Sequence, residues 1–192
     1  MKQLLIINGH PDKESFNYAL SDAYQEGATQ VNTAVESINI ADLKFNPNLQ
    51  FGYRKRMELE PDLVEALDKI KRADHIVWVF PMWWYGLPAM MKGFIDRVFL
   101  PGISFQYVEG KPFPKQLLKG KTARVIITAD APKWYNDWYM RRPLINQFKR
   151  GVLEFCGIRP VKVTYLAPVK SSNLAIRNKW LEKVRQLGRQ LS

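Results

Sequence analysis

The sequence is poor in the residues that build disulfides and metal sites. It contains one cysteine, Cys156, and two histidines, His10 and His75. A single cysteine excludes an internal disulfide, and one thiol with two imidazoles is too small a set for a usual zinc site. We therefore expect no bound metal.

Long apolar runs are also missing. No stretch approaches the roughly 20 apolar residues that a membrane-spanning helix needs, so we expect no membrane insertion. The opening residues, MKQLLIINGH, hold an apolar run of only four residues and predict a first strand rather than a signal peptide. With so little cysteine, the natural interpretation is a cytoplasmic protein.

Several motifs that carry chemistry are absent. The chain has neither G-x-G-x-x-G nor G-x-x-x-x-G-K-[ST], which argues against a dinucleotide-binding Rossmann site and a Walker loop. It also lacks G-x-S-x-G, and its carboxylates are scattered rather than paired. Cys156 lies in the apolar segment LEFCGI and fits a buried, inert thiol better than a nucleophile.

The composition is that of a folded, basic protein. The chain has 192 residues, of which 46% are apolar, so we expect residues 1–192 to form one domain. The net charge is +11, which attracts anionic small molecules as well as nucleic acid. Residues 170–192 carry much of the excess and predict an amphipathic helix with these side chains inward: Leu174, Leu181, Val184, Leu187 and Leu191. Basic residues on such a helix are usually just solvated, so we expect no nucleic-acid binding.

Apolar runs and helical segments alternate along the chain. This alternation predicts an α/β fold with a parallel sheet and helices on both faces. The strands are expected at 4–7, 34–40, 76–80, 125–127 and 161–166, the last as an edge strand because its apolar residues alternate. The helices are expected at 16–30, 61–72, 88–99, 143–156 and 173–190, with long connections at 44–57 and 101–121.

Ligands of open α/β sheets bind at the carboxyl ends of the strands. Three segments at such ends are candidates for ligand binding. The first, NGHPDKESFNYAL (residues 8–20), leads from a strand into a helix whose free N–H groups suit a phosphate. Ser15, Asn17 and His10 add side-chain donors. The alternative is that Ser15 only caps the helix and His10 is a turn residue.

The second segment, FPMWWYGLP (residues 80–88), places two tryptophans and a tyrosine between two prolines. Its backbone groups from Met82 to Tyr85 could bond the edge of a heterocycle while the rings cover its face. The alternative is a dimer patch, since aromatic residues also favour interfaces.

The third segment, TADAPKWYNDW (residues 128–138), joins a turn of small residues to three aromatic rings. Tyr135 could donate a hydrogen bond to a carbonyl oxygen and stabilise charge there. The alternative is that Trp134, Tyr135 and Trp138 pack on one another. The three segments together are rich in aromatics and donors but poor in acids and bases, which is typical of a site whose cofactor does the chemistry.

The ordered set of these segments resembles the flavodoxin-like NAD(P)H:quinone oxidoreductases, the group that contains mammalian quinone reductase and the bacterial modulator of drug activity B. The resemblance covers about residues 1–168. Its matches are His10 with Ser15–Tyr18, Asp42–Leu43 with Phe45–Pro47, Phe80–Pro81, Trp84, Gly86, Pro88, Lys92–Gly93, Arg97–Phe99, and Phe155–Gly157. It implies a three-layer, five-stranded sheet in the order 2-1-3-4-5 and a homodimer.

The resemblance also implies a function. The protein would bind FAD, or alternatively FMN, and pass two electrons from NAD(P)H to a quinone or similar electrophile in ping-pong order. A flavin-binding regulatory or redox-sensing subunit, and a flavodoxin-type electron carrier, are the alternatives. The implied cofactor-binding residues are His10, Ser15, Phe16, Asn17, Pro81, Met82, Trp83, Trp84, Tyr85, Thr128, Ala129 and Asp130, and Tyr135 is the implied catalytic residue.

Two departures from the family pattern stand out. Ala129–Pro132 replaces a glycine-rich loop, and Asp130 adds a negative charge there. The region where the mammalian enzyme has a substrate-side histidine holds Arg141 and Arg142 instead. An arginine at this place could attract the phosphates of NAD(P)H.

Overall fold

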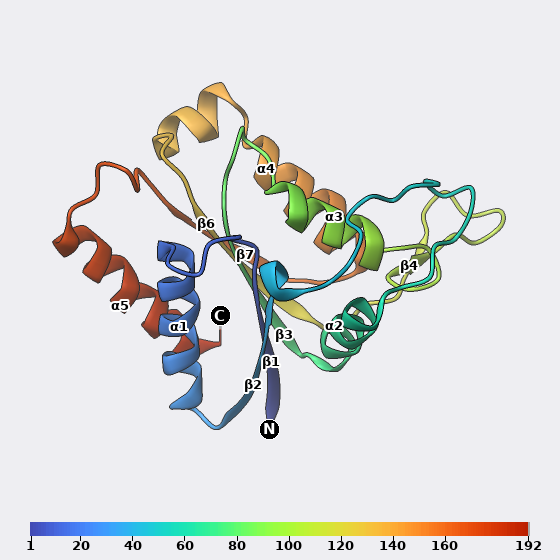
Figure 1. Cartoon of the computed structure of the whole chain (residues 1–192), viewed down its shortest axis with the longest axis horizontal. Coiled ribbons are helices and arrows are strands. Elements are labelled where there is room, and N and C mark those ends of the chain that lie inside the picture. Colours follow the sequence, from blue (N-terminus) through green and yellow to red (C-terminus); the bar gives the residue numbers. More distant parts are fainter. Residues whose placement is uncertain (192) are drawn as a thin grey trace.

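The computed structural model, which describes residues 1–191, is built around a five-stranded parallel sheet (Figure 1). The sheet order is β2-β1-β3-β6-β7, which is 2-1-3-4-5 when the sheet strands are counted along the chain, so the predicted sheet is confirmed. The strands are β1 (Lys2–Asn8), β2 (Thr33–Asn39), β3 (His75–Pro81), β6 (Thr122–Thr128) and β7 (Val161–Leu166).

The burial of each strand follows its place in the sheet. Every residue of the central β3 is buried, because helices cover both of its faces. In β7 buried residues are interspersed with exposed and half-buried ones, and this strand lies at one edge of the sheet, as its sequence predicts.

Helices form a layer on each face of the sheet (Figure 1). On one side, α1 (Phe16–Thr29) and α5 (Leu174–Gln190) cover a core that includes Leu4 and Val77. On the other side, residues of α2, α3 and the helix after α4 enclose Trp78 and Phe80. These elements are α2 (Pro61–Arg72), α3 (Ala89–Val98), α4 (Pro143–Ile145) and the π-helical η3 (Asn146–Glu154), which continues α4.

The two helices of the first layer touch at glycines. A Cβ at Gly27 of α1 would lie 2.0 Å from the carbonyl oxygen of Arg185, and one at Gly188 of α5 would lie 2.2 Å from that of Tyr24. Val184 is fully buried at this contact, and Leu181, Leu187 and Leu191 pack against the same core. The inward prediction for Leu174 is wrong: it is the first residue of α5, and 74% of its surface is exposed.

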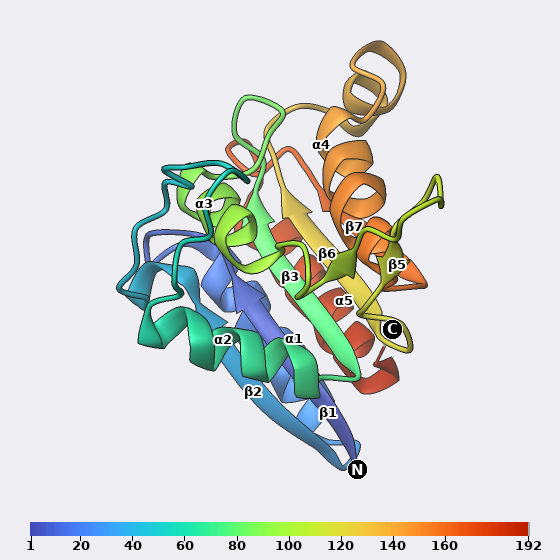
Figure 2. The same cartoon turned by 90° about the vertical axis from the view of Figure 1, so that its right-hand side faces the viewer.

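Four short elements lie in the connections between the main helices and strands. After β2 comes a single 3-10 turn, η1 (Ile40–Asp42). Within 101–121, β4 (Phe105–Gln106) pairs antiparallel with β5 (Lys115–Gln116), a ribbon too short to show in the sequence pattern (Figure 2). Between β6 and α4 lies the π-helical turn η2 (Tyr135–Tyr139).

Arg97 fixes the connection between η1 and α2 to the core. Its side chain is 0% exposed and donates to the carbonyl oxygens of Asn46 at 2.5 Å and Glu58 at 2.7 Å, and to the carboxylate of Glu60 at 2.8 Å. Burial acts to raise the pKa of Glu60, but hydrogen bonds from the Asn46 N–H and from Arg97 outweigh it and lower that pKa. The buried guanidinium of Arg97, with the half-buried carboxylate of Glu60, therefore holds a segment with little regular structure in one place.

Candidate functional site

A cavity of about 230 Å³ opens at the carboxyl ends of β1, β3 and β6. We call it the strand-end cavity. Ten of the twelve predicted cofactor-binding residues line it: His10, Ser15, Phe16, Asn17, Pro81, Met82, Trp83, Thr128, Ala129 and Asp130. Trp84 and Tyr85 are the two that do not.

The loop after β1 is shaped by its own polar side chains. Asn8 accepts a hydrogen bond from the His10 N–H at 2.9 Å and donates one to Ser21 at 2.9 Å. The Asp12 N–H donates to Nδ1 of His10 at 3.0 Å, so the neutral ring carries its hydrogen on Nε2. Burial lowers the pKa of His10 despite the opposing effect of Asp12. A neutral ring with a donor at Nε2 therefore faces this cavity at pH 7.

The start of α1 leaves polar groups without partners. Ser15 occupies the predicted N-cap position, but no side chain caps the helix. Within residues 1–191, the hydroxyl groups of Ser15 and Tyr18 are buried and have no hydrogen-bond partner. Each such group costs about 1–3 kcal/mol. A helix N-terminus with unpaired hydroxyls fits the phosphate and polyol groups of a nucleotide-type ligand.

Thr128, at the end of β6, bonds both to the start of α1 and to the loop after β3. Its hydroxyl donates to the Asn17 side chain of α1 at 3.1 Å, and its carbonyl oxygen accepts from the Met82 N–H at 2.8 Å. This Met82 N–H, and that of Trp83, which donates to Gly86 at 3.2 Å, are therefore engaged within the chain. The sequence suggests that backbone groups from Met82 to Tyr85 bond a ligand. The N–H groups of Met82 and Trp83 bond within the chain instead, so this suggestion does not hold for them.

The aromatic segment after β3 forms a tight hairpin turn. Trp83 and Gly86 exchange both backbone hydrogen bonds, and the two residues between them have positive φ, 51° for Trp84 and 57° for Tyr85. This geometry is that of a type I′ turn, which normally takes Asn-Gly. Trp84 is 100% exposed and Trp83 packs edge-on to His10 at 5.6 Å. The turn thus carries strain and presents aromatic rings beside the cavity.

Tyr135 lies at the edge of the site, outside the lining of the strand-end cavity. It is the first residue of η2 and stacks on Tyr139 with ring centroids 4.9 Å apart. It also contacts Trp134 at 5.7 Å and Tyr85 at 6.4 Å. The three rings named in the alternative interpretation do not all pack together, because Trp138 is exposed. The catalytic role of Tyr135 stays a prediction.

Two residues of the cavity were not foreseen. Val169 and Lys170 follow β7, and they bond to the loop after β6. The Val169 N–H donates to the carbonyl oxygen of Ala129 at 3.0 Å, and the Lys170 N–H donates to the carboxylate of Asp130 at 2.7 Å. The signal was present, because the strand-end rule applies to the end of β7 as well.

The remaining residues with reactive side chains have structural roles. His75 is buried between the Tyr24 hydroxyl at 3.3 Å and the Thr122 hydroxyl at 2.6 Å. Burial, aided by the charge of Arg124, lowers its pKa to about 4. Burial raises the pKa of the Cys156 thiol to about 12, which makes this thiol inert at pH 7.

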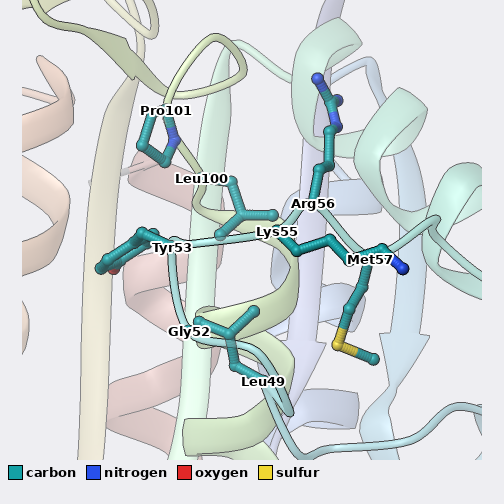
Figure 3. A pocket seen from close by; sticks show the side chains of 8 residues that line it. All are labelled: Leu49, Gly52, Tyr53, Lys55, Arg56, Met57, Leu100 and Pro101. Carbon is teal, nitrogen blue, oxygen red and sulfur yellow. The ribbon is translucent and has the colours of Figure 1, made fainter.

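A separate cavity of about 130 Å³ lies between residues 49–57 and the Leu100–Pro101 segment (Figure 3). Its lining is mostly apolar, with Lys55 and Arg56 at its border, and none of the predicted site residues reaches it. Across residues 1–191 we find no cluster of three or more metal-ligating side chains. Over the same residues, no helix combines the length and apolar character needed to cross a bilayer.

A parallel sheet of this order, with a cavity where the strand order reverses, defines the flavodoxin-like fold class. The chain belongs to the flavodoxin-like fold family, whose sequence model matches residues 2–187.

Similar proteins agree with this assignment. NAD(P)H dehydrogenase [quinone] 1 of Rattus norvegicus is 26% identical over 185 residues, covering 83% of this chain and 66% of the rat protein. This chain thus spans about two thirds of that relative. An uncharacterized NAD(P)H oxidoreductase of Haemophilus influenzae is 29% identical over 164 residues, covering 82% of this chain and 80% of its own. The resemblance to this oxidoreductase group is therefore confirmed.

Solved structures show the same fold. Smu.1420 from Streptococcus mutans superposes with a TM-score of 0.85 at 31% identity, covering 98% of this chain and 99% of that one. An FMN-dependent NADH-azoreductase from Bacillus anthracis, in complex with FMN, superposes with a TM-score of 0.78 at 21% identity and 99% coverage of both chains. At that lower identity the likeness concerns the fold alone.

Proposed function

We propose that this protein is a flavin-dependent NAD(P)H oxidoreductase that passes two electrons to quinones or similar electrophiles. The observation that carries the proposal is the convergence of three strand-end segments on the strand-end cavity. The names of the relatives, NAD(P)H dehydrogenase [quinone] and NAD(P)H oxidoreductase, support the reaction class. A bound flavin would supply the chemistry by accepting two electrons from the donor and releasing them to the acceptor, in ping-pong order.

The residues divide into two sets by the part of the flavin they suit. The uncapped start of α1 suits the phosphate and ribityl groups, with His10, Ser15, Phe16 and Asn17 around it. The opposite wall suits the ring system. It is formed by Pro81, Met82 and Trp83 on one side and by Thr128, Ala129 and Asp130 on the other. Trp84 and Tyr85 lie in the turn beside this wall and would contact the ring from outside the cavity lining.

Tyr135 is the residue we assign to the acceptor. It contacts Tyr85 beside the cavity, and its hydroxyl can donate a hydrogen bond to a quinone oxygen as negative charge develops there. Replacement by Phe is expected to lower kcat for the quinone while leaving flavin binding unchanged.

The finer details belong to the same proposal. The cofactor is FAD, which the Ser-Phe-Asn-Tyr match implies, with FMN as the alternative. The protein acts in the cytoplasm as a homodimer of single flavin-binding domains, and rings of the exposed Trp84 region are shared with the second subunit. Sedimentation of the flavin-loaded protein tests the dimer.

The first experiment is the visible spectrum of the purified protein after incubation with FAD or FMN and desalting. Retained flavin bands that NAD(P)H bleaches and a quinone restores are expected, and steady turnover separates an enzyme from a carrier or sensor. Retention of neither flavin would contradict the proposal.

A matched pair of variants sharpens this experiment. Ser15→Ala removes a hydroxyl that has no partner within residues 1–191, so the apo-protein should stay as stable as the wild type while flavin affinity falls. Ser171→Ala removes an exposed hydroxyl and should change neither. Equal flavin affinity in all three proteins would contradict the assigned role of Ser15.

A further inference from the structure

The turn that carries Tyr135 is held together by one carboxylate, that of Asp137. This turn runs from Lys133 to Arg142 and contains η2, and we call it the η2 turn. Figure 2 shows it at one end of the molecule, beyond α4 and clear of the sheet. A segment in such a place has little core to pack against, so its conformation depends on contacts within the turn.

Asp137 binds both ends of the η2 turn. Lys133, four residues before it, forms an ion pair with its carboxylate. Arg142, five residues after it, contacts both carboxylate oxygens, with Nε 2.9 Å from Oδ1 and Nη2 3.0 Å from Oδ2. A forked contact of this kind is directional as well as strong. The two cations therefore close the turn from its first residue to its last.

The carboxylate is buried, but its two partners are not. Only 8% of the Asp137 side chain is exposed, against 65% for Lys133 and 53% for Arg142. Burial acts to raise the pKa of Asp137, but the hydrogen bonds from Lys133 and Arg142 outweigh burial and lower that pKa. Asp137 is therefore ionised at pH 7. Without it, the two exposed cations would return to water at little cost, so the fold itself does not depend on the pairs.

The end of the η2 turn has a backbone that needs such a restraint. Arg141 and Arg142 have φ of 57° and 55°, a left-handed conformation that is unfavourable for residues with a Cβ. The Arg142 N–H donates to the carbonyl oxygen of Asn136 at 2.9 Å, and the Asn146 N–H donates to that of Arg142 at 2.9 Å. Backbone strain persists only where several contacts restrain it together. The forked contact with Asp137 is the side-chain part of this restraint.

Tyr135 lies inside the turn that Asp137 closes. Its ring stacks on Tyr139 with centroids 4.9 Å apart and planes inclined by 24°, and it contacts Tyr85 at 6.4 Å. The Met140 N–H donates to the carbonyl oxygen of Tyr135 at 3.0 Å. Because Tyr135 and Tyr139 belong to the same turn as Asp137, a shift of the turn displaces both rings. A catalytic donor must be held within roughly 0.5 Å of its productive position.

We propose that Asp137 is the positioning residue of Tyr135. By binding Lys133 and Arg142 it fixes the η2 turn, and with the turn it fixes the Tyr135 hydroxyl that the electron acceptor meets. The inference rests on the proposed function, which assigns Tyr135 to the acceptor. Asp137 is not part of the lining of the strand-end cavity, so it acts through the turn and not by touching a ligand there.

The first test follows the two halves of the reaction separately. In the flavin-loaded variant Asp137→Asn, which keeps the shape of the side chain but not its charge, stopped-flow absorbance records flavin reduction by NADPH and reoxidation by a quinone. We expect reoxidation to slow about 3- to 10-fold, because a displaced donor assists less. Flavin reduction and flavin affinity should stay as in the wild type.

A second variant keeps one of the two pairs. Arg142→Gln removes the forked contact and leaves Lys133 in place, so it should slow reoxidation by a smaller factor than Asp137→Asn. An unchanged reoxidation rate in both variants, or an equal slowing of both half-reactions, would overturn the role of Asp137.

A double-mutant cycle shows whether Asp137 acts through Tyr135. If it does, Asp137→Asn should slow reoxidation no further in a protein that already carries Tyr135→Phe. Losses that simply add would contradict the positioning role. The control variant is Asp96→Asn, which breaks a pair of the same spacing, Lys92 with Asp96 on α3. It should match the wild type in every measurement.

A measurement on the full-length protein without flavin separates this inference from the proposed function. Trypsin cleaves after exposed arginines, and Arg141 is exposed in the η2 turn and is not a partner of Asp137. We expect cleavage after Arg141 to be at least about 5-fold faster in Asp137→Asn than in the wild type and in Asp96→Asn. If no donor supports turnover but this pattern holds, the proposed function fails and the restraint of the turn by Asp137 stands. Equal cleavage in the three proteins overturns the restraint.

Discussion

At the scale of single residues, the turn at Trp84 and Tyr85 lowers the stability of the fold but places two aromatic rings beside the cavity. A left-handed conformation costs roughly 1–2 kcal/mol for an ordinary side chain, and two consecutive residues adopt it here. The double variant Trp84→Asn/Tyr85→Gly installs the residues that this turn prefers. We expect its free energy of unfolding in urea to rise by about 1–2 kcal/mol, while flavin affinity falls about 2- to 10-fold through lost ring contacts.

The exposed Trp138 provides the control for this turn. Trp138→Ala also removes a large ring, but it relieves no positive φ, so its free energy of unfolding should equal that of the wild type. A turn variant that is less stable than the wild type would show that the rings pack more than they strain.

His75 makes folding sensitive to acid. Its pKa is about 4 in the folded protein and about 6.5 in an unfolded chain, so the unfolded state binds the proton first. The stability that neutral His75 contributes is complete above pH 6.5 and is lost as pH falls through 6.5 toward 4, by on the order of 3 kcal/mol. Urea unfolding between pH 7.5 and 4.5 should show a steeper loss for the wild type than for His75→Gln. Parallel curves would contradict this account.

At the scale of elements, the contact of α1 with α5 depends on two glycines that admit no side chain. A methyl group at Gly27 or Gly188 would lie within 2.2 Å of a backbone carbonyl oxygen of the other helix. Gly27→Ala should therefore force the helices apart and lower the free energy of unfolding by about 1–3 kcal/mol or more. Thermal or urea unfolding measures the loss.

Gly151 in η3 is the matched control, since the nearest atom to its added Cβ would be 3.9 Å away. There the same change removes backbone freedom from a helical glycine and should stabilise the protein by roughly 0.5–1 kcal/mol. Equal effects at Gly27 and Gly151 would show that helix propensity, and not the interhelical contact, decides both.

The sheet and its main helices were predictable because their signals are local. Continuous apolar runs mark the buried β1 and β3, and Pro61 marks the start of α2. The β4–β5 ribbon has two residues in each strand, which is too few to show the alternation of apolar and polar residues that marks a strand. The π-helical turns depend on hydrogen bonds to the fifth residue back, such as Met140 N–H to Tyr135, which no residue pattern announces.

At the scale of the whole molecule, the candidate site was predictable as far as a general rule gathers residues by strand end. That rule brings His10, Met82 and Thr128 to one cavity although 118 positions separate the first from the last. The environment of Arg124 was not predictable, because its guanidinium reaches the Thr164 hydroxyl only once β6 and β7 are paired. Charge that is scattered in sequence becomes a local field only in the fold.

The net charge of +11 gives the whole molecule a testable dependence on salt. Screening acts over about 30 Å at 0.01 M ionic strength and about 8 Å at 0.15 M. A phosphate-bearing donor should therefore lose affinity as salt is added, and an uncharged quinone should not. We expect KM for NADPH to rise about 3- to 10-fold between these two ionic strengths, while KM for the quinone stays constant. A KM for NADPH that stays constant as salt is added would contradict this account.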